Sequence, residues 1–184
     1  MLLWGDEMLV LKYIVSGIGF FSSIGATLIK GNTKKQFALM IILTFFSNFF
    51  TALGYIFNPE GLNGVASCAL GCIICLVNLF FRSKELPIPK IVLAIYYIGF
   101  FVINIINRST LVLTTIAILA TFTFVANLSQ KGGKGFRIWK LANNLLWGLY
   151  DIISGSYNQL IVLHIPIASV TLYSIYQFDI RKSK

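Results

Sequence analysis

The sequence alternates between long apolar segments and short polar breaks. The apolar segments are each about 20 residues long, which is the length that an α-helix needs to cross a bilayer. Barrel strands would be about ten residues long with alternating polarity, so the pattern favours helices. We predict an all-α membrane protein with seven transmembrane helices, at residues 9–30, 36–57, 62–82, 88–106, 110–129, 136–155 and 159–178.

The breaks between these segments contain residues that stop a helix. Asn58-Pro59-Glu60-Gly61 predicts a turn, because Pro fixes φ and Gly permits a positive φ. Leu86-Pro87-Ile88-Pro89 ends one helix and begins the next. Asn107-Arg108-Ser109 is a short break with polar side chains that suit the cap of the following helix.

The composition supports lipid as the solvent of most of the surface. Of the 184 residues, 57% are hydrophobic and only 11% are charged, whereas about a quarter of an average soluble chain is charged. We therefore expect residues 1–184 to form a single integral membrane domain. The net charge of +9 is then better explained by cytoplasmic loops than by nucleic-acid binding, which we do not expect.

The basic residues predict an orientation. All Lys and Arg except Lys12 and Arg108 fall at alternate breaks or at the C-terminal end, namely Lys30, Lys34, Lys35, Arg82, Lys84, Lys90, Lys131, Lys134, Arg137, Lys140, Arg181, Lys182 and Lys184. The other breaks hold the acidic residues Asp6, Glu7 and Glu60. Basic residues collect in the cytoplasm, so the N-terminus is predicted outside and the C-terminus inside. An odd number of spans follows.

The pattern of segments and loops also repeats. Ser47-Asn48-Phe49-Phe50 in the second segment corresponds to Asn143-Asn144-Leu145-Leu146 in the sixth. Each triplet of segments has a basic loop after its first helix and a short turn after its second. We predict a parallel 3+1+3 repeat, with repeat 1 at about 9–82, a linker helix at about 88–106 and repeat 2 at about 110–178.

Two resemblances add to this picture. Leu141-Ala142-Asn143-Asn144-Leu145-Leu146-Trp147-Gly148-Leu149-Tyr150 resembles the sixth span of SWEET-type sugar transporters. Over nearly the whole chain the sequence is similar to the YgjV-like bacterial inner membrane family, in its length, its Gly17-Ile18-Gly19 and its basic loop before a Phe-rich second span. These resemblances imply a bacterial inner membrane location and a layout like that of SWEET and PnuC-type transporters. The first and fifth segments lack the proline that is usual in SWEET-like repeats.

One face of the sixth segment carries the candidate substrate-binding residues. At helical spacing it presents Asn143, Asn144, Trp147, Tyr150, Asp151 and Ser154. A polar face toward lipid would be costly, so we predict that it faces protein or a water-filled cavity. Two interpretations are open: a site where a ring-bearing solute stacks and hydrogen-bonds, or asparagines that join neighbouring helices.

Further candidates lie in other segments. Asn48 and Asn144 would form a pseudo-symmetric pair near the midplane, where transporter sites usually lie. Asn78 is assigned either to the substrate or to a bond with a neighbouring backbone. Asp151 is predicted to bind substrate or a coupling proton, or to pair structurally with Lys12 or Arg108. Asn104 and Asn107 lie near a helix end and are interpreted as interfacial.

The seventh segment contains the one histidine of the chain, His164, two residues before Pro166. Pro166 leaves the carbonyl of Val162 without its helical partner, which predicts either a hinge for alternating access or a packed bend. His164 is interpreted as a structural residue, with a proton relay as the alternative.

No catalytic residues, metal site or cofactor are expected. The three cysteines, Cys68, Cys72 and Cys75, have no fourth ligand nearby and are interpreted as small residues at a helix contact. We find no nucleophile–base set and no phosphate-binding loop, so the protein is not expected to be an enzyme.

The leading hypothesis is a facilitator or proton-coupled carrier for a sugar, nucleoside or vitamin-like solute. Its predicted partners are the bilayer and that small polar solute, and a homo-oligomer is compatible. The alternative is a non-transporting scaffold, sensor or subunit of a complex. A carrier predicts a cavity at Asn48, Asn144 and Trp147, whereas a scaffold predicts a filled core with the two asparagines bonded to each other.

Overall fold

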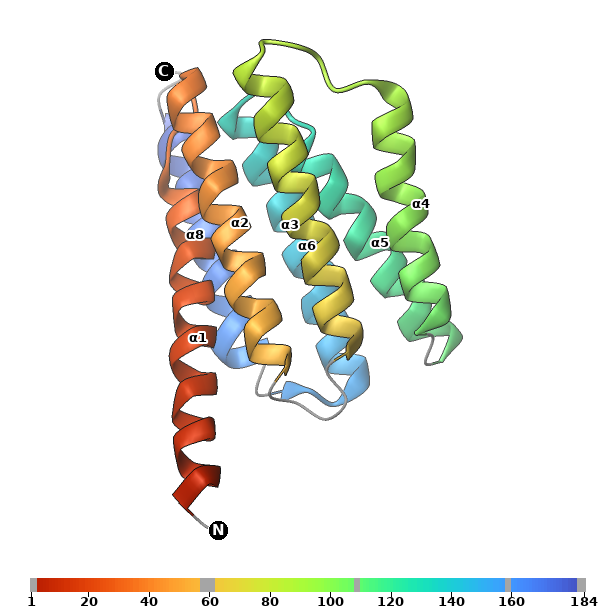
Figure 1. Ribbon diagram of the computed structural model, residues 1–184. Helices are drawn as coiled ribbons and strands as arrows, with labels where there is room; N and C mark the ends of the chain where they lie inside the picture. Colours follow the sequence, from red (N-terminus) through yellow and green to blue (C-terminus); the bar gives the residue numbers. More distant parts are fainter. Residues whose placement is uncertain (1–2, 57–61, 108–109, 158–159, 182–184) are drawn as a thin grey trace.

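A computed structural model describes residues 3–56, 62–107, 110–157 and 160–181. Within these ranges the chain has helices and no strands. The helices are α1 (Leu3–Leu28), α2 (Lys34–Ile56), α3 (Leu62–Ser83), α4 (Lys90–Ile106), α5 (Leu111–Leu128), α6 (Gly133–Ser154) and α8 (Ile165–Ile175), with π-helical turns η1 (Leu160–His164) and η2 (Tyr176–Ile180) on either side of α8 (Figure 1). The predicted all-α class is confirmed, and each predicted segment corresponds to a helix.

Four helical stretches are long and apolar enough to cross a membrane: Lys34–Gly54, Val65–Ser83, Leu111–Leu128 and Leu160–Ile180. Two further apolar stretches, Tyr13–Leu28 and Lys90–Ile106, are shorter. These stretches suggest a membrane-embedded protein. Helix α6 is less apolar because it carries Lys134, Arg137, Lys140 and Asp151.

Two helix starts differ from the prediction by more than two residues. Helix α1 begins at Leu3 rather than at residue 9, because Asp6 and Glu7 are compatible with a helix even though they interrupt the apolar pattern. Helix α6 begins at Gly133, directly after Gly132 in extended conformation. The cap of α5 is Thr110, whose side chain accepts a hydrogen bond from the Leu113 N–H at 3.3 Å.

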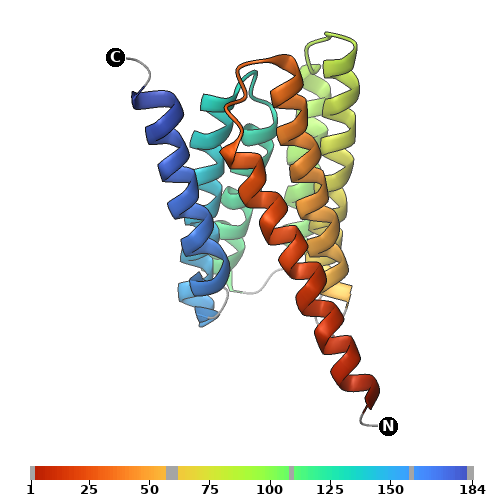
Figure 2. The same ribbon diagram turned by 90° about the vertical axis from the view of Figure 1, so that its left-hand side faces the viewer.

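The helices form a ring in which each one packs against the next along the chain. Contacts run from α1 through α2, α3, α4, α5 and α6 to α8, and α8 returns to pack against α1. Figure 1 shows this arrangement, and Figure 2 shows the start of α1 projecting beyond the other helices. The first and last helices are therefore neighbours.

The two ends of the ring differ in charge. One end carries the breaks at 29–33, 84–89 and 129–132 together with Arg181, and we call it the basic end (top of Figure 1). The opposite end carries Asn107, Thr110, residues 155–157 and the N-terminus of α1. The alternate placement of basic breaks predicted from the sequence thus corresponds to one face of the fold.

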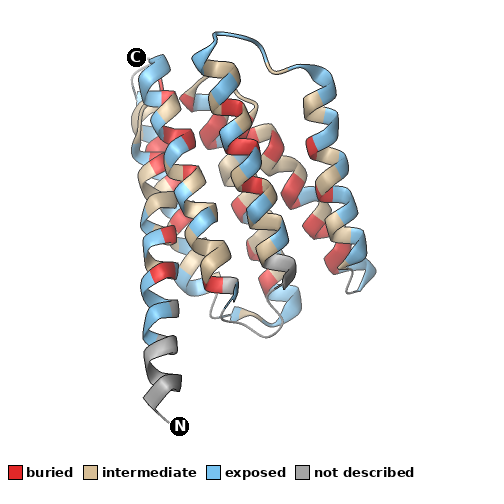
Figure 3. Cartoon of the chain, in the orientation of Figure 1, coloured by how far each residue is buried: buried red, intermediate tan, exposed pale blue. Residues whose placement is uncertain are grey.

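Buried residues occur along most of the height of the ring (Figure 3), and their main cluster lies toward the basic end. It is an apolar cluster of Ala26, Phe37, Met40, Ile41, Ile74, Cys75, Tyr96, Phe100, Val125, Leu128 and Phe136. Phe37 of α2 and Phe136 of α6 meet edge to face at 5.9 Å between ring centroids. The Arg82 guanidinium lies 4.0 Å from the centroid of the Phe37 ring. Aromatic side chains from opposite sides of the ring therefore fill its basic end.

Candidate functional site

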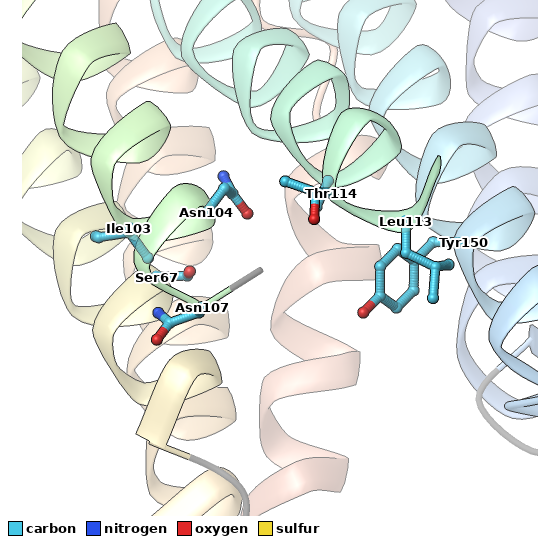
Figure 4. A pocket seen from close by; sticks show the side chains of 8 residues that line it. Ser67, Ile103, Asn104, Asn107, Leu113, Thr114 and Tyr150 are labelled. Atoms are coloured by element: carbon cyan, nitrogen blue, oxygen red, sulfur yellow. The ribbon is translucent and has the colours of Figure 1, made fainter. Parts of the chain in front are cut away.

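A cavity of about 100 Å³ opens toward the end of the ring opposite the basic end. Four helices contribute to its lining, which consists of Ser67, Ile103, Asn104, Asn107, Leu113, Thr114, Ala117 and Tyr150 (Figure 4). Hydroxyl and amide groups supply the polar part of this lining, and none of the described residues that line it is charged. The groups are suited to hydrogen bonds with a neutral solute.

Thr114 is the lining residue whose buried side-chain hydroxyl is left without a hydrogen-bond partner in the described part of the chain. It is buried, and its Oγ1 has no hydrogen-bond partner among the described residues. Figure 4 shows this oxygen directed into the space between α4 and Tyr150. A buried hydroxyl without a partner costs about 1–3 kcal/mol. A solute or water in the cavity would remove that cost once a small shift of the neighbouring side chains opens the way to the oxygen.

Asn104 is oriented by its neighbours. Its Nδ2 donates to the carbonyl oxygen of Phe100 at 2.8 Å and to Oγ1 of Thr121 at 3.1 Å. With its nitrogen held in this way, the amide oxygen is directed toward the cavity (Figure 4). The site therefore presents a fixed acceptor from α4 opposite the hydroxyl of Thr114 on α5.

Tyr150 is the predicted site residue that lines the cavity. It stacks edge to face against Trp147, with 5.4 Å between the ring centroids. Trp147 is half-buried and supports Tyr150 from the same helix without belonging to the lining. The aromatic pair predicted from the sequence thus places one ring at the cavity and the other behind it.

Asn143 and Asn144 bond to different neighbouring helices. Asn143 Nδ2 donates to the carbonyl oxygen of Ala120 on α5 at 2.6 Å and lies 3.4 Å from Oγ1 of Thr123. Asn144 is buried and bonds to His164, with Nδ2 on the carbonyl oxygen at 2.6 Å and Oδ1 on ring Nδ1 at 2.9 Å. Both contacts fit the interpretation that these asparagines join helices.

Asp151 lies beside His164. Its Oδ2 is 3.1 Å from Nε2 of the imidazole, and the two side chains are only 4% and 13% exposed. The predicted partners Lys12 and Arg108 lie outside the described side chains, and the structure supplies His164 as a partner that the prediction did not include. Asp151, His164 and Asn144 thus form one buried cluster between α6 and η1.

Asn48 and Asn78 lie away from the cavity. Asn48 Nδ2 donates to the carbonyl oxygen of Thr44 in its own helix at 2.8 Å. Asn78 is fully buried toward the basic end, where its Nδ2 donates to the carbonyl oxygen of Leu128 at 3.2 Å and its Oδ1 accepts from the Tyr96 hydroxyl at 3.3 Å. Asn78 therefore has the backbone bond that was its alternative role.

The described cavity lies at a different place from the predicted one, and the predicted substrate-binding site stays a prediction. A cavity was expected at Asn48, Asn144 and Trp147, but none of these residues lines the one found. Asn144 is hydrogen-bonded to His164, and Asn48 is hydrogen-bonded to a backbone carbonyl of its own helix. Asn104 and Asn107, which were interpreted as interfacial, line the cavity together with the unpredicted residues Ser67 and Thr114. A common signal was available: all four are polar residues near helix ends on the same side of the predicted membrane.

Pro166 follows a widened turn. Residues Leu160–His164 form the π-helical turn η1, and Pro166 occupies the first turn of α8. A π-helical turn next to a proline is a common form of local irregularity in a helix. The expected break in regular helix is present, and the predicted hinge motion stays a prediction.

The basic end is closed by backbone and side-chain contacts. The Gly133 N–H donates to the carbonyl oxygen of Gly31 at 3.1 Å, joining the two basic breaks. Arg137 is fully buried and forms an ion pair with Asp179 of η2. Arg82 donates to the carbonyl oxygen of Gln130. The sequence prediction counted Arg137 among the basic residues around a cytoplasmic break and missed this pair; the only signal was an acid within the basic C-terminal segment.

Comparison of the chain with protein-family models, with curated proteins and with solved structures found no match.

Proposed function

We propose that the protein is a small-solute membrane carrier whose binding site is the cavity at Ser67, Asn104, Asn107, Thr114 and Tyr150. The observation that carries the proposal is the difference between the two ends of the ring. One end holds a polar cavity, and the other is filled by apolar side chains and a buried ion pair. Alternating access requires a central or lateral site that is open to only one side at a time.

The chemistry of the cavity favours a neutral polar solute. Its hydroxyl and amide groups donate and accept hydrogen bonds, and the described lining residues carry no charge that would balance an ion. A cavity of about 150 Å³ is large enough for benzene, so about 100 Å³ accommodates a smaller polyol or amide. A sugar, nucleoside or vitamin-like solute would insert one polar edge, with the rest in the open mouth.

We extend the proposal to the layout in the membrane. Helices α1–α3 and the segment from α5 to η2 would be the two repeats, with α4 as the linker between them. The cavity lies where α3 and α4 meet α5 and α6, which is the kind of repeat interface where transporters bind substrate. This assignment agrees with the resemblance to SWEET, PnuC-type and YgjV-like proteins.

The proposed orientation places the basic end in the cytoplasm of a bacterial cell, with the N-terminus outside. The placement of Lys and Arg supports this assignment. The cavity would then face outward. Fluorescent-protein and alkaline-phosphatase fusions at the C-terminus test the orientation: fluorescence without phosphatase activity is expected, and the reverse result would overturn it.

The transport proposal is tested by uptake into proteoliposomes. The panel should increase in size from glycerol through pentitols and hexoses to nucleosides, so that the largest accepted solute reports the size of the site. Uptake or binding of at least one solute is expected. If folded protein neither binds nor transports any of them, the carrier proposal is wrong and a scaffold role is favoured.

A matched pair of variants locates the site. Thr114→Val removes the unpaired hydroxyl from the cavity, whereas Thr115→Val makes the same change at the next residue, which is exposed and bonds to the carbonyl of Leu111. A neutral hydrogen bond contributes about 0.5–1.5 kcal/mol, so KM should rise about 2- to 10-fold in Thr114→Val. Equal KM values in the two variants would place the site elsewhere.

A further inference from the structure

The cluster of Asp151, His164 and Asn144 has a proton arrangement that the geometry determines. Asn144 contacts His164 through both ends of its amide. A carbonyl oxygen only accepts hydrogen bonds, so the amide end 2.6 Å from the His164 carbonyl must be the nitrogen. The other end, 2.9 Å from Nδ1 of the imidazole, is then the oxygen.

This orientation fixes one imidazole proton. The Asn144 oxygen is an acceptor, so Nδ1 must carry a hydrogen in order to bond with it. In a neutral imidazole the remaining nitrogen, Nε2, then has a lone pair and no hydrogen. Nε2 is the nitrogen that lies 3.1 Å from Oδ2 of Asp151.

Oδ2 of Asp151 is buried without a hydrogen-bond partner among the described residues, and Nε2 of His164 lies 3.1 Å from it. If Asp151 were ionised and His164 neutral, two acceptors would face each other at 3.1 Å in a buried place. One added proton resolves this, whether it resides on the carboxyl or on the imidazole, and it also makes the pair neutral overall. A buried uncompensated charge costs several kcal/mol, so burial also favours the pair with its proton.

Few other ionisable groups on the neighbouring elements could bind the proton in place of Asp151 and His164. Helix α5 has no ionisable side chain, and in η1 and α8 only Tyr173 accompanies His164. Helix α6 adds Tyr150 at the cavity, the exposed Lys134 at its start, and Arg137 and Lys140, which bond toward the basic end. Helix α1 adds the exposed Tyr13, while Asp6, Glu7, Lys12 and Arg108 have no described side chain.

The cluster connects the cavity with the irregular segment before Pro166. Asp151 follows Tyr150, which lines the cavity, and Asn144 lies near the midpoint of the same helix. On the other side, His164 is the last residue of η1, two residues before Pro166. Loss of the proton would set two acceptors against each other and weaken the contact that holds η1 to α6.

We propose that Asp151 and His164 form the binding site for one exchangeable proton, and that this proton is the coupling ion of the carrier. The coupling part rests on the proposed transport function. No covalent bond is made: the proton passes between water and the carboxyl–imidazole pair as that pair is exposed to one side or the other. Asn144 is a positioning residue that holds His164 in the Nδ1–H form.

The proton site is tested by nitrogen-15 NMR of the imidazole in protein reconstituted in nanodiscs. His164 is the only histidine, so a histidine-labelled sample gives one pair of ring signals without assignment. The wild type should show Nδ1 protonated and a pH-dependent shift of the Nε2 signal as the pair gains or loses its proton, whether the carboxyl or the imidazole holds that proton. A neutral imidazole protonated on Nε2 would overturn the proposal.

Variants extend this measurement. Asp151→Asn should move the pH of the Nε2 change, whereas Glu85→Gln, the same change at an exposed carboxylate far from His164, should leave it unmoved. Asn144→Leu removes the positioning acceptor and should shift the population toward the Nε2–H form. Titration curves of Asp151→Asn and wild type that coincide would contradict the proposal, provided that the variant retains the wild-type helix content.

Coupling is tested by uptake with and without an imposed pH gradient. The wild type should accumulate solute severalfold with the gradient, and Asp151→Asn should lose that stimulation while retaining solute exchange at equal pH. If wild-type uptake is the same with and without the pH gradient, the coupling proposal is wrong and the carrier proposal is unaffected. Absence of any uptake would overturn the carrier function, and the NMR titration would still decide whether the pair binds a proton.

Discussion

The guanidinium of Arg137 contacts the carboxylate of Asp179 through two parallel hydrogen bonds. Nε lies 2.9 Å from Oδ2 and NH2 lies 2.6 Å from Oδ1, and the side chains are 0% and 7% exposed. The remaining nitrogen, NH1, donates to the carbonyl oxygens of Ile29 and Lys30 at 2.9 and 3.1 Å. One side chain therefore joins the end of α1, the start of α6 and η2 at the basic end.

Asp179→Asn should destabilise the protein by about 3 kcal/mol. The substitution removes the negative charge and leaves the Arg137 guanidinium buried without a counter-charge, and breaking a buried pair from one side costs about 3–5 kcal/mol. An asparagine oxygen still accepts one hydrogen bond, which favours the lower value. Reversible unfolding in mixed micelles, followed by far-UV circular dichroism, measures the change in unfolding free energy.

The exposed ion pair of Lys34 and Glu85 is the control for that measurement. Its nitrogen and oxygen are also 2.6 Å apart, but the side chains are 81% and 70% exposed. The hydrogen bond from Lys34 lowers the pKa of Glu85, so the pair is complete at neutral pH and is lost on acidification. Exposed pairs contribute little, so Glu85→Gln should leave stability unchanged. A similar loss in Asp179→Asn and Glu85→Gln would contradict the closed basic end.

Gly31→Ala and Gly133→Ala should each destabilise the protein by more than about 2 kcal/mol, because neither position has room for a side chain. Gly31 has φ +70°, and a Cβ there would lie 2.6 Å from Sδ of Met40 and 2.7 Å from Cα of Gly133. A Cβ on Gly133 would collide with the Lys30 carbonyl oxygen. Thermal unfolding in detergent measures the effect.

Gly17→Ala is the matched control, because a Cβ at Gly17 would have nothing within 4 Å. Alanine in a helix interior is about 0.5–1 kcal/mol more favourable than glycine, so this variant should be unchanged or slightly more stable. Melting temperatures that fall equally in Gly17→Ala and Gly31→Ala would show that the two basic breaks do not approach as closely as described.

The helices could be predicted because lipid requires long apolar segments with internally bonded backbone. The interior face of α6 was predictable for a related reason: a polar stripe cannot face lipid cheaply, and Asn144 and Asp151 are indeed buried. What each polar group contacts was not predictable. Periodicity defines a direction on one helix, but it does not say which neighbour that face meets.

The missed contacts show the same limit. Arg137 and Asp179 are 42 positions apart, and their pairing depends on α8 returning beside α1 and α6. The cavity requires the ends of four helices to converge, so Asn104 and Thr114 acquire their role only in the assembled ring. Asp151 was correctly identified as a residue that needs a partner, but only the fold brings His164 to it.

Asn78 and Asn48 should differ in their effect on stability. Asn78→Ala leaves the Leu128 carbonyl and the Tyr96 hydroxyl without partners in the core, so a loss of about 2–3 kcal/mol is expected. Asn48→Ala removes only a bond within its own helix and should cost less than about 1 kcal/mol. Unfolding free energies of the two variants test this, and equal losses would show that Asn48 has a partner across the ring.

Thr114→Val and Thr121→Val should differ in their effect on stability although both threonines are buried on α5: only Thr121→Val should destabilise the protein. Thr121 Oγ1 donates to the Ala117 carbonyl at 2.9 Å and accepts from Asn104 at 3.1 Å, so its loss should cost about 1–2 kcal/mol. Thr114 Oγ1 has no partner among the described residues, so Thr114→Val should leave solute-free protein equally stable or slightly more stable. Unfolding free energies without and with the transported solute measure both effects. Wild type should gain stability from the solute while Thr114→Val gains less. If the two substitutions lower the unfolding free energy equally in the absence of solute, the Thr114 hydroxyl already has a hydrogen-bond partner. It would then not be free to bind a solute.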